Sequence, residues 1–215
     1  MTRLAAIDVG SNSIRLLVAD YDASTGLSVI DEVRDQPRLA QGLATTGRLD
    51  EAAMQHALQV LARMREICER RGVERISAVA TSAVREASNG EEFIRRAQES
   101  VGIPLRIIDG NTEAALSYRS VAHHFNLDAS RTLVADIGGG SLELIGAVRG
   151  VVEATASLPL GAVRLTELYL AETGDTIRRI RKLRAHARKQ IRKRLSAGEW
   201  SRAHLIGSGG TFTTL

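Results

Sequence analysis

Two pairs of short, largely apolar segments mark the start and the middle of the chain. The first pair covers residues 3–9 and 13–22, and the second covers 132–136 and 142–148. Short apolar runs bounded by turn residues are typical of strands, and a glycine-containing turn joins each pair, so each pair is predicted to form a β-hairpin. Further strands are predicted at 27–34, 75–80, 104–108, 151–157 and 203–206.

Helical periodicity follows the first three strands. Apolar residues recur every three or four positions between Asp50 and Arg71, where Asp50 suits an N-cap and Gly72 a C-terminal stop. Other helices are predicted at about 91–100, 111–124, 162–172 and 175–195. Strands followed by alternating helices and strands predict an α/β half-domain with a mixed sheet, and the second half of the chain repeats this plan.

The turns of the two hairpins share a motif at a constant offset of 128 residues. The matched positions are Asp8, Gly10, Ser13 and Leu16 in the first and Asp136, Gly138, Ser141 and Leu144 in the second. This repeat predicts two related halves that face one another. Glycines have no Cβ, so backbone N–H groups in such a turn can close on an anion, and two turns could clamp a chain of phosphates. For one turn taken alone, an ordinary glycine-rich hairpin is the plainer interpretation.

Composition narrows the class of protein. The 215 residues are 44% hydrophobic and 25% charged, which is ordinary for a soluble globular protein of one large or two small domains. A net charge of +4 favours anionic partners. No apolar run approaches ~18 residues, so neither a membrane span nor a signal peptide is predicted. Cys68 is the only cysteine, which excludes an internal disulfide framework, and the predicted location is the cytoplasm.

Two aspartates and a glutamate flank the glycine turns. Asp8 and Asp136 each end a predicted strand, where a divalent cation would let a carboxylate act beside phosphate. Each could instead cap its own turn, but the matched pair favours metal coordination. Glu143 points to the same face as Ser141, and it either meets metal, water or substrate or is simply solvated.

Glu113 and Arg85 are further candidates. Glu113 lies in the first turn of a predicted helix, where it could stabilise the helix dipole or act as a general base on water. A capping box fits poorly because the residue three positions earlier is Gly110, but the residues alone still favour the structural role. Arg85 follows a strand, where a guanidinium can bind phosphate, although an ion pair with Glu86 or Glu91 is the commoner arrangement.

The helix predicted at 175–195 is strongly basic. Its apolar stripe can dock on the core, and the opposite face carries lysines and arginines that could guide a long polyanion or be solvated. Nucleic-acid binding is disfavoured because no aromatic stacking residues accompany these charges.

Six motifs in series resemble one family. In order they are Asp8-Val-Gly-Ser-Asn-Ser, Ala80-Thr-Ser-Ala-Val-Arg, Asp109-Gly-Asn-Thr-Glu-Ala, Asp136-Ile-Gly-Gly-Gly-Ser-Leu-Glu, Leu160-Gly-Ala-Val-Arg and Gly207-Ser-Gly-Gly-Thr. Together they resemble the exopolyphosphatase / guanosine pentaphosphate phosphohydrolase (Ppx/GppA) family of the actin–Hsp70–sugar-kinase superfamily. The match spans nearly the whole chain.

The resemblance implies an α/β fold of two ribonuclease-H-like (actin-like ATPase) domains with mixed sheets, residues 1–125 and 126–215, with the active site in the cleft between them. It implies hydrolysis of terminal phosphate from polyphosphate, or conversion of pppGpp to ppGpp, assisted by Mg²⁺ or another divalent cation. Glu113 matches the catalytic glutamate, and Asp136 and Glu143 match acidic residues of the second phosphate loop. The implied phosphate-binding residues are Gly10, Ser11, Asn12, Ser13, Arg85, Gly138, Gly139, Gly140 and Ser141. Gly207, Ser208, Gly209, Gly210 and Thr211 match a nucleotide-contacting loop, and Asp8 joins Asp136 and Glu143 as an expected metal ligand.

Other functions stay open on the sequence. A phosphotransferase of the same superfamily would bind ATP through the loop at 207–211, and a non-catalytic relative would bind polyphosphate or (p)ppGpp as a sensor. The sequence does not choose between polyphosphate and pppGpp, and a homodimer is compatible with it. Because a further helix is expected after residue 211, the second domain is predicted to be truncated at its C-terminus.

Overall fold

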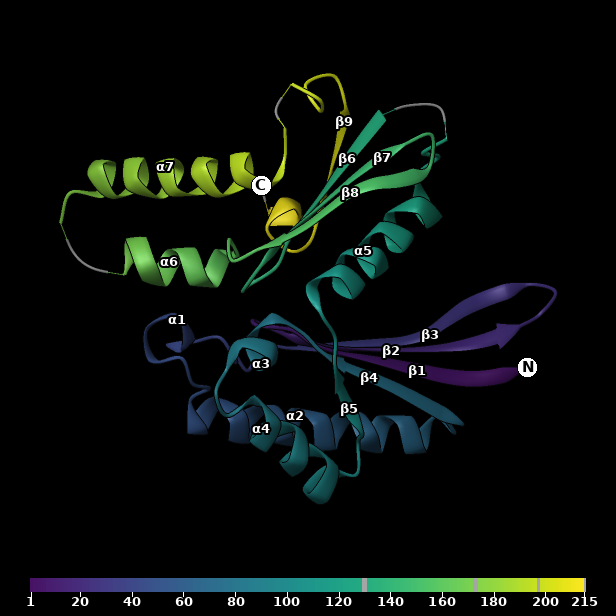
Figure 1. Cartoon of the computed structure of the whole chain (residues 1–215). Helices are drawn as coiled ribbons and strands as arrows, with labels where there is room; N and C mark the ends of the chain where they lie inside the picture. The colour runs from purple at the N-terminus through teal and green to yellow at the C-terminus, as the bar shows by residue number, and fades with distance from the viewer. Residues whose placement is uncertain (129–130, 172–173, 197, 215) are drawn as a thin grey trace. The chain divides into compact units, whose positions relative to one another are not determined.

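The computed structural model describes residues 1–128, 131–171, 174–196 and 198–214 (Figure 1). Its internal contacts divide the chain into two compact units, Met1–Ile108 (unit 1) and Asp109–Leu215 (unit 2). Among the described residues, no helix is both long enough and apolar enough to cross a membrane.

Unit 1 is built on a five-stranded mixed sheet in the order β3-β2-β1-β4-β5. Its strands are β1 (Thr2–Val9), β2 (Ile14–Asp22), β3 (Gly26–Asp35), β4 (Arg75–Ala80) and β5 (Leu105–Ile107). The first three strands are antiparallel neighbours, whereas β4 runs parallel to β1 and to β5. The predicted strands and the mixed sheet are therefore confirmed in this half.

Helix α2 (Glu51–Arg70) confirms the longest helical prediction of unit 1. It buries Met54, Ala57, Leu61, Met64 and Cys68, which share one face because they recur every three or four residues. The Asp50 carboxylate accepts a hydrogen bond from the Ala53 N–H at 3.0 Å and so caps the helix as predicted.

The shorter helices of unit 1 differ in detail from the sequence prediction. The turn expected at 81–86 is a short helix, α3 (Ser82–Glu86), and α4 (Gly90–Arg96) ends in a π-helical turn, η1 (Ala97–Val101). Helix α1 (Leu43–Thr46) was not predicted, because four residues are too few to show a helical period.

The four-stranded sheet of unit 2 repeats the part of the unit 1 sheet formed by β3, β2, β1 and β4. Its strands are β6 (Arg131–Ile137), β7 (Leu142–Val148), β8 (Val151–Leu158) and β9 (His204–Ser208), in the order β8-β7-β6-β9. The last strand, β9, runs parallel to β6, as β4 does to β1. The hairpin pairing is also repeated, because Val9 pairs with Ile14 and Ile137 with Leu142. The predicted pair of related halves is confirmed at the level of the backbone.

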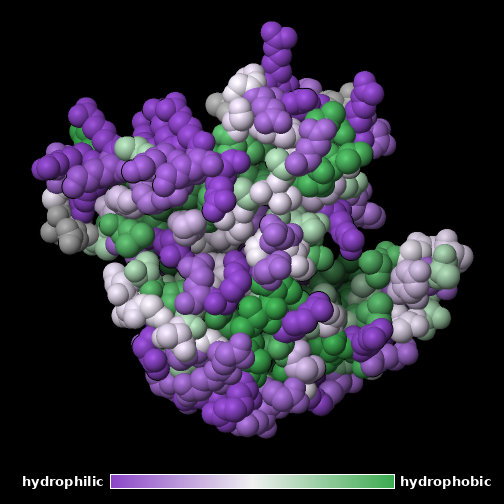
Figure 2. Space-filling view, in the orientation of Figure 1, coloured by the Kyte–Doolittle hydropathy of each residue, from purple (hydrophilic) through white to green (hydrophobic). Residues whose placement is uncertain are grey.

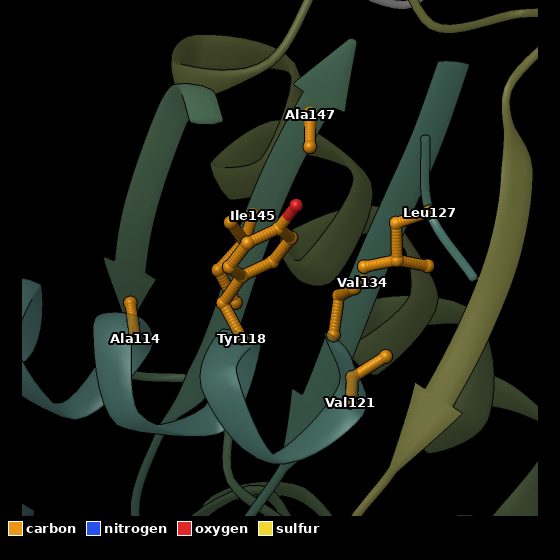
Figure 3. Packing of buried hydrophobic residues seen from close by; sticks show 7 residues of the cluster. All are labelled: Ala114, Tyr118, Val121, Leu127, Val134, Ile145 and Ala147. Carbon is orange, nitrogen blue, oxygen red and sulfur yellow. The ribbon is translucent and has the colours of Figure 1, made fainter. Parts of the chain in front are cut away.

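Both faces of the unit 2 sheet are covered. Helix α5 (Gly110–His124) packs on one face through a cluster that Figure 3 shows, made of Ala114, Tyr118, Val121, Leu127, Val134, Ile145 and Ala147. Helices α6 (Ala162–Leu170) and α7 (Thr176–Arg194) supply Leu165, Ala187 and Ile191 to a second cluster with Ala135 and Leu144. Successive strand residues point to opposite faces, so Val134 and Ala135 belong to different clusters. The η2 turn (Phe212–Thr214) follows β9.

The division of the chain differs from the predicted boundary between residues 125 and 126. The structure divides after Ile108, because α5 packs on β6 and β7 and therefore belongs to unit 2. The sequence shows that α5 is a helix but not which sheet buries its apolar face. The helix predicted at 162–172 is α6, and its predicted last residue, Glu172, lies outside the described residues.

Candidate active site

The glycine turn between β6 and β7 has the same closure as the turn between β1 and β2. The Gly138 N–H donates to the Ser141 carbonyl at 3.0 Å, and the Gly10 N–H donates to the Ser13 carbonyl at 3.0 Å. The two predicted phosphate loops therefore share the same closing hydrogen bond, each within its own unit.

The start of α6 orients the loop at 138–141. Carbonyl oxygens of Gly138, Gly139 and Gly140 accept hydrogen bonds from the N–H groups of Ala162, Val163 and Gly161, at 2.9 to 3.2 Å. In a trans peptide the C=O and the next N–H point to opposite sides, so the N–H groups of residues 139–141 point away from α6. Three adjacent N–H groups on one side of a turn form a concavity suited to an anion.

Gly161 allows this close approach. A Cβ at position 161 would lie 2.3 Å from the Gly140 carbonyl carbon and 2.4 Å from Gly139, nearer than side-chain carbons come to backbone. The Nε of Arg164 also donates to the Gly140 carbonyl at 2.9 Å. Helix α6 thus fixes the loop through backbone contacts that only glycine permits at this position.

The loop at 10–13 is held by a different segment. The Ala40 N–H donates to the Ser11 carbonyl at 2.8 Å, and the Arg38 N–H donates to the Asn12 carbonyl at 3.1 Å. By the same peptide geometry, the N–H groups of Asn12 and Ser13 point away from this segment.

Two carboxyl groups lie across from each other beside the second loop. Asp136 on β6 and Glu143 on β7 are direct cross-strand partners, and Ser157 on β8 is the next residue in the same row. Directly opposed residues of an antiparallel pair share a face of the sheet. The Ser157 Oγ donates to Glu143 Oε1 at 2.9 Å, and Glu143 is only 2% exposed.

The N-terminal half of α5 covers this row. A Cβ on Gly110 would lie 2.5 Å from the Ser157 Cβ, and the Ser117 Oγ donates to Asp136 Oδ2 at 2.6 Å. Glu113 lies one helical turn before Ser117, so it projects from the same side of the helix. The structure therefore brings Glu113, Asp136 and Glu143 together within unit 2.

Glu113 is not the acid of a capping box. Asp109 is the N-cap, because its carboxylate accepts from the Thr112 N–H at 2.7 Å. Glu113 comes one residue after the third helical position, which a capping box would use. This geometry excludes the capping box, and the helix dipole remains a local role for Glu113.

The carboxyl cluster changes the protonation of Glu143. Burial raises the pKa of Glu143 from the usual 4.5 to about 7, and the negative charges of Glu113 and Asp136 add to the increase. Hydrogen bonds from Ser141 and Ser157 oppose part of this pKa shift. The cluster therefore has an excess of negative charge that a cation or a shared proton would relieve.

The third glycine loop lies against the same aspartate. A Cβ on Gly209, whose φ is +88°, would lie 2.6 Å from Asp136 Oδ1 and 2.6 Å from the Ile137 carbonyl oxygen. The Thr211 hydroxyl donates to that carbonyl at 3.3 Å. Unit 2 therefore places the loops at 138–141 and 207–211 side by side at the end of β6.

The other predicted site residues belong to unit 1. Asp8 lies on β1 across from Arg15, and the side chain of Asp8 is exposed. Arg85 lies on α3, and its Nη1 donates to the Ile108 carbonyl at 2.8 Å. Their roles beside phosphate or metal stay predictions. A pocket of about 840 Å³ in unit 1, at the start of α2, is lined by none of the predicted site residues.

The acidic pair is a partial match to a metal centre. Within the described residues, no three histidine, cysteine, aspartate or glutamate side chains form a group that could hold a metal ion. Mg²⁺ commonly binds to one or two carboxylates and takes its remaining oxygens from phosphate and water. Asp136 and Glu143 fit that arrangement, since they lie on one face with uncompensated charge.

Two hydroxyl groups were not singled out from the sequence. Ser117 and Ser157 donate to Asp136 and Glu143, respectively. The position of Ser117 four residues after Glu113 was a usable signal, because it puts both on one side of a helix. The role of Ser157 depends on the register of β7 and β8, which the sequence does not give.

Comparisons with known proteins agree with this architecture. The model of the Ppx/GppA phosphatase family matches residues 17–215. Exopolyphosphatase 1 of Mycobacterium leprae is 34% identical over 182 residues, which are 85% of this chain and 54% of that protein. Exopolyphosphatase 2 of Mycobacterium tuberculosis is 34% identical over 229 residues, which are 100% of this chain and 70% of that protein.

Solved structures confirm the predicted fold class. An exopolyphosphatase from Cytophaga hutchinsonii matches with a TM-score of 0.87 and 29% identity, over 99% of this chain and 68% of that one. MreB5 of Spiroplasma citri matches with a TM-score of 0.50 and 14% identity, over 98% of this chain and 85% of that one. At this identity the match shows only that the two chains share the actin-like fold.

The present chain spans about half the length of the mycobacterial exopolyphosphatase 1 proteins. The family match nevertheless covers far more than half of the chain, and it includes the carboxyl cluster and the last two glycine loops. On this evidence the chain belongs to the Ppx/GppA phosphatase family.

Proposed function

We propose that this chain carries the active site of a phosphoanhydride hydrolase that releases terminal phosphate from inorganic polyphosphate. The observation that carries the proposal is the meeting of Glu113, Asp136 and Glu143 beside a glycine loop whose N–H groups point away from α6. The names of the similar exopolyphosphatases support polyphosphate as the substrate. Conversion of pppGpp to ppGpp is a second candidate reaction, because it would break the same type of bond, a terminal phosphoanhydride.

The loops would bind the substrate. N–H groups of residues 139–141 would donate to oxygens of the terminal phosphate, and those of the loop at 10–13 are a second set of donors suited to a phosphate. Donors fixed before the reaction stabilise the charge that develops on the phosphoryl oxygens. Arg85 would add a charged donor.

Glu113 would activate the attacking water. Its carboxylate would accept a proton from water as the water oxygen forms a bond to the terminal phosphorus and the bridging P–O bond breaks. The shortened chain would leave with the bridging oxygen. A positioned general base contributes roughly 10²–10⁴-fold to rate.

Asp136 and Glu143 would hold Mg²⁺ together with substrate oxygens. The bound ion would neutralise charge on the phosphates. Ser117 and Ser157 would orient the two carboxylates through the hydrogen bonds described above. Asp8 is a further candidate ligand from unit 1.

Phosphate release tests the proposal. The chain is assayed with long-chain polyphosphate, tripolyphosphate, pppGpp and ATP, each with Mg²⁺ and with EDTA. We expect phosphate to be released from polyphosphate when Mg²⁺ is present and not when EDTA is present. The Glu113→Gln variant should lose at least about 100-fold in turnover but still bind polyphosphate. Glu153→Gln is the matched control, because Glu153 is an exposed glutamate of β8.

Two results would contradict the assignment. Near-normal turnover by Glu113→Gln would remove Glu113 as the base. ADP formation that depends on an added hydroxyl acceptor would instead indicate a phosphotransferase.

A further inference from the structure

Helix α7 concentrates the positive charge of the chain. It holds ten lysine and arginine residues and no aspartate or glutamate. Since the net charge of the whole chain is +4, everything outside α7 sums to −6. The basic character of the protein therefore lies in one surface helix.

Most of these cations share one side of α7. The opposite side packs on the unit 2 sheet through Ala187 and Ile191. At 3.6 residues per turn, eight of the ten project away from that packed side or to its flank, and seven of these eight are exposed. These seven, called here the basic face of α7, are all exposed: Arg178, Arg181, Lys182, Arg188, Lys189, Arg192 and Lys193. Figure 2 shows the hydrophilic surface that covers α7.

The basic face lacks paired carboxylates among the residues that the structure describes. In the part of the chain that the structure describes, no carboxylate pairs with any of the seven. Helices of unit 1 differ, because Arg65, Arg95 and Arg96 each pair with a glutamate. Like charges three or four residues apart on a helix repel one another, so the basic face destabilises α7. An anion from outside the chain would offset this repulsion.

The residue types of α7 favour an anion that lacks nucleobases. The helix contains no phenylalanine, tyrosine or tryptophan on which a nucleobase could stack. Along the helix axis the basic face presents roughly one cation per 3 to 4 Å, from the 1.5 Å rise per residue. A flexible chain with charge on every repeating unit can follow such a row.

The basic face also belongs to the same unit as the second phosphate loop. Helix α6 begins on the carbonyls of residues 138–140 and then packs along α7 (Figure 1). One unit thus carries a loop suited to a terminal phosphate and a separate surface suited to a long polyanion.

We propose that the basic face of α7 is a second binding surface for polyphosphate, which holds the body of a long chain away from the loops. This inference rests on the proposed function for the identity of the anion. It predicts that α7 contributes to affinity for long chains only, because tripolyphosphate is too short to occupy both the loops and a helix of 19 residues.

The test uses the full chain and neutralises the three lysines of the basic face. Lys182→Gln, Lys189→Gln and Lys193→Gln are combined, and the dissociation constant for long-chain polyphosphate is measured in EDTA at 50 and 200 mM salt. We expect affinity at low salt to fall about tenfold, and the slope of log K against log salt to fall by about two, at roughly 0.7 per lost contact. Turnover of tripolyphosphate should not change.

A second triple variant has the same charge change elsewhere. Arg70→Gln, Arg75→Gln and Arg202→Gln neutralise exposed arginines outside α7 and should leave long-chain affinity unchanged. An unchanged affinity for the α7 variant, or an equal loss in both variants, would overturn the proposal. So would tighter binding of duplex DNA or RNA of equal phosphate content that is lost in the α7 variant.

The same experiment separates this inference from the proposed function. If no substrate is hydrolysed but the α7 variant alone loses long-chain binding, the hydrolase proposal fails and the binding surface stands. If tripolyphosphate is hydrolysed but the α7 variant binds long chains normally, the reverse holds.

Discussion

Glu143 makes the stability of unit 2 depend on pH. Its carboxyl group is 2% exposed, and its pKa in the folded chain is about 7 instead of the usual 4.5. The folded state therefore binds this proton more tightly than the unfolded state does. As pH rises from about 4.5 to 7, the unfolded chain loses the proton first, so the free energy of unfolding falls.

Glu143→Gln removes this titration and keeps an acceptor for the Ser157 hydroxyl. The raised pKa corresponds to about 3 kcal/mol in total, at 1.36 kcal/mol per pKa unit. Most of this change in unfolding free energy falls between pH 5 and pH 8, because the interval covers most of the span between the two pKa values, 4.5 and about 7. The variant should therefore gain about 2 to 3 kcal/mol in unfolding free energy relative to the parent chain over this interval.

Urea unfolding at pH 5, 6, 7 and 8 measures the gain, with EDTA present to exclude bound cations. Glu153→Gln is again the control, since an exposed glutamate should give a difference that does not vary with pH. A Glu143→Gln difference that stays constant within about 0.5 kcal/mol from pH 5 to pH 8 would refute the reasoning.

Two further substitutions test the contacts around the loop and the acidic pair. Gly161→Ala places a Cβ within 2.4 Å of the Gly139 and Gly140 backbone, so we expect a loss of about 1–3 kcal/mol in thermal or urea unfolding and a raised KM. Gly198→Ala, where a Cβ meets nothing within 4 Å, should change neither. Ser117→Ala removes the hydrogen bond to Asp136 and should raise the Mg²⁺ concentration for half-maximal activity several-fold, with recovery in Ser117→Thr; an unchanged Mg²⁺ dependence would contradict this role.

The hairpins and long helices could be predicted because their signals are local. The repeated turn motif identifies β1–β2 and β6–β7, and the helical period together with Asp50 identifies α2. The family motifs also point to Glu113, Asp136 and Glu143 before any contact is known.

What could not be predicted depends on tertiary packing. The sequence predicts a helix at 111–124, but the choice of β6 and β7 as the partners of α5 emerges only from the folded unit. For the same reason, neither the hydrogen bond from Ser117 to Asp136 nor the raised pKa of Glu143 follows from spacing alone. The tight contact at Gly161 is likewise visible only when α6 is seated on the loop.

The repeated hairpin differs in charge between its two copies. Asp8 lies across from a basic residue, Arg15, whereas Asp136 lies across from an acidic one, Glu143. An ancestral duplication of one hairpin would explain the shared backbone, and divergence at this single cross-strand position would explain the asymmetry. The two hairpins would then differ in function: the pair of Asp8 and Arg15 is balanced in charge, whereas the pair of Asp136 and Glu143 is negatively charged and attracts cations.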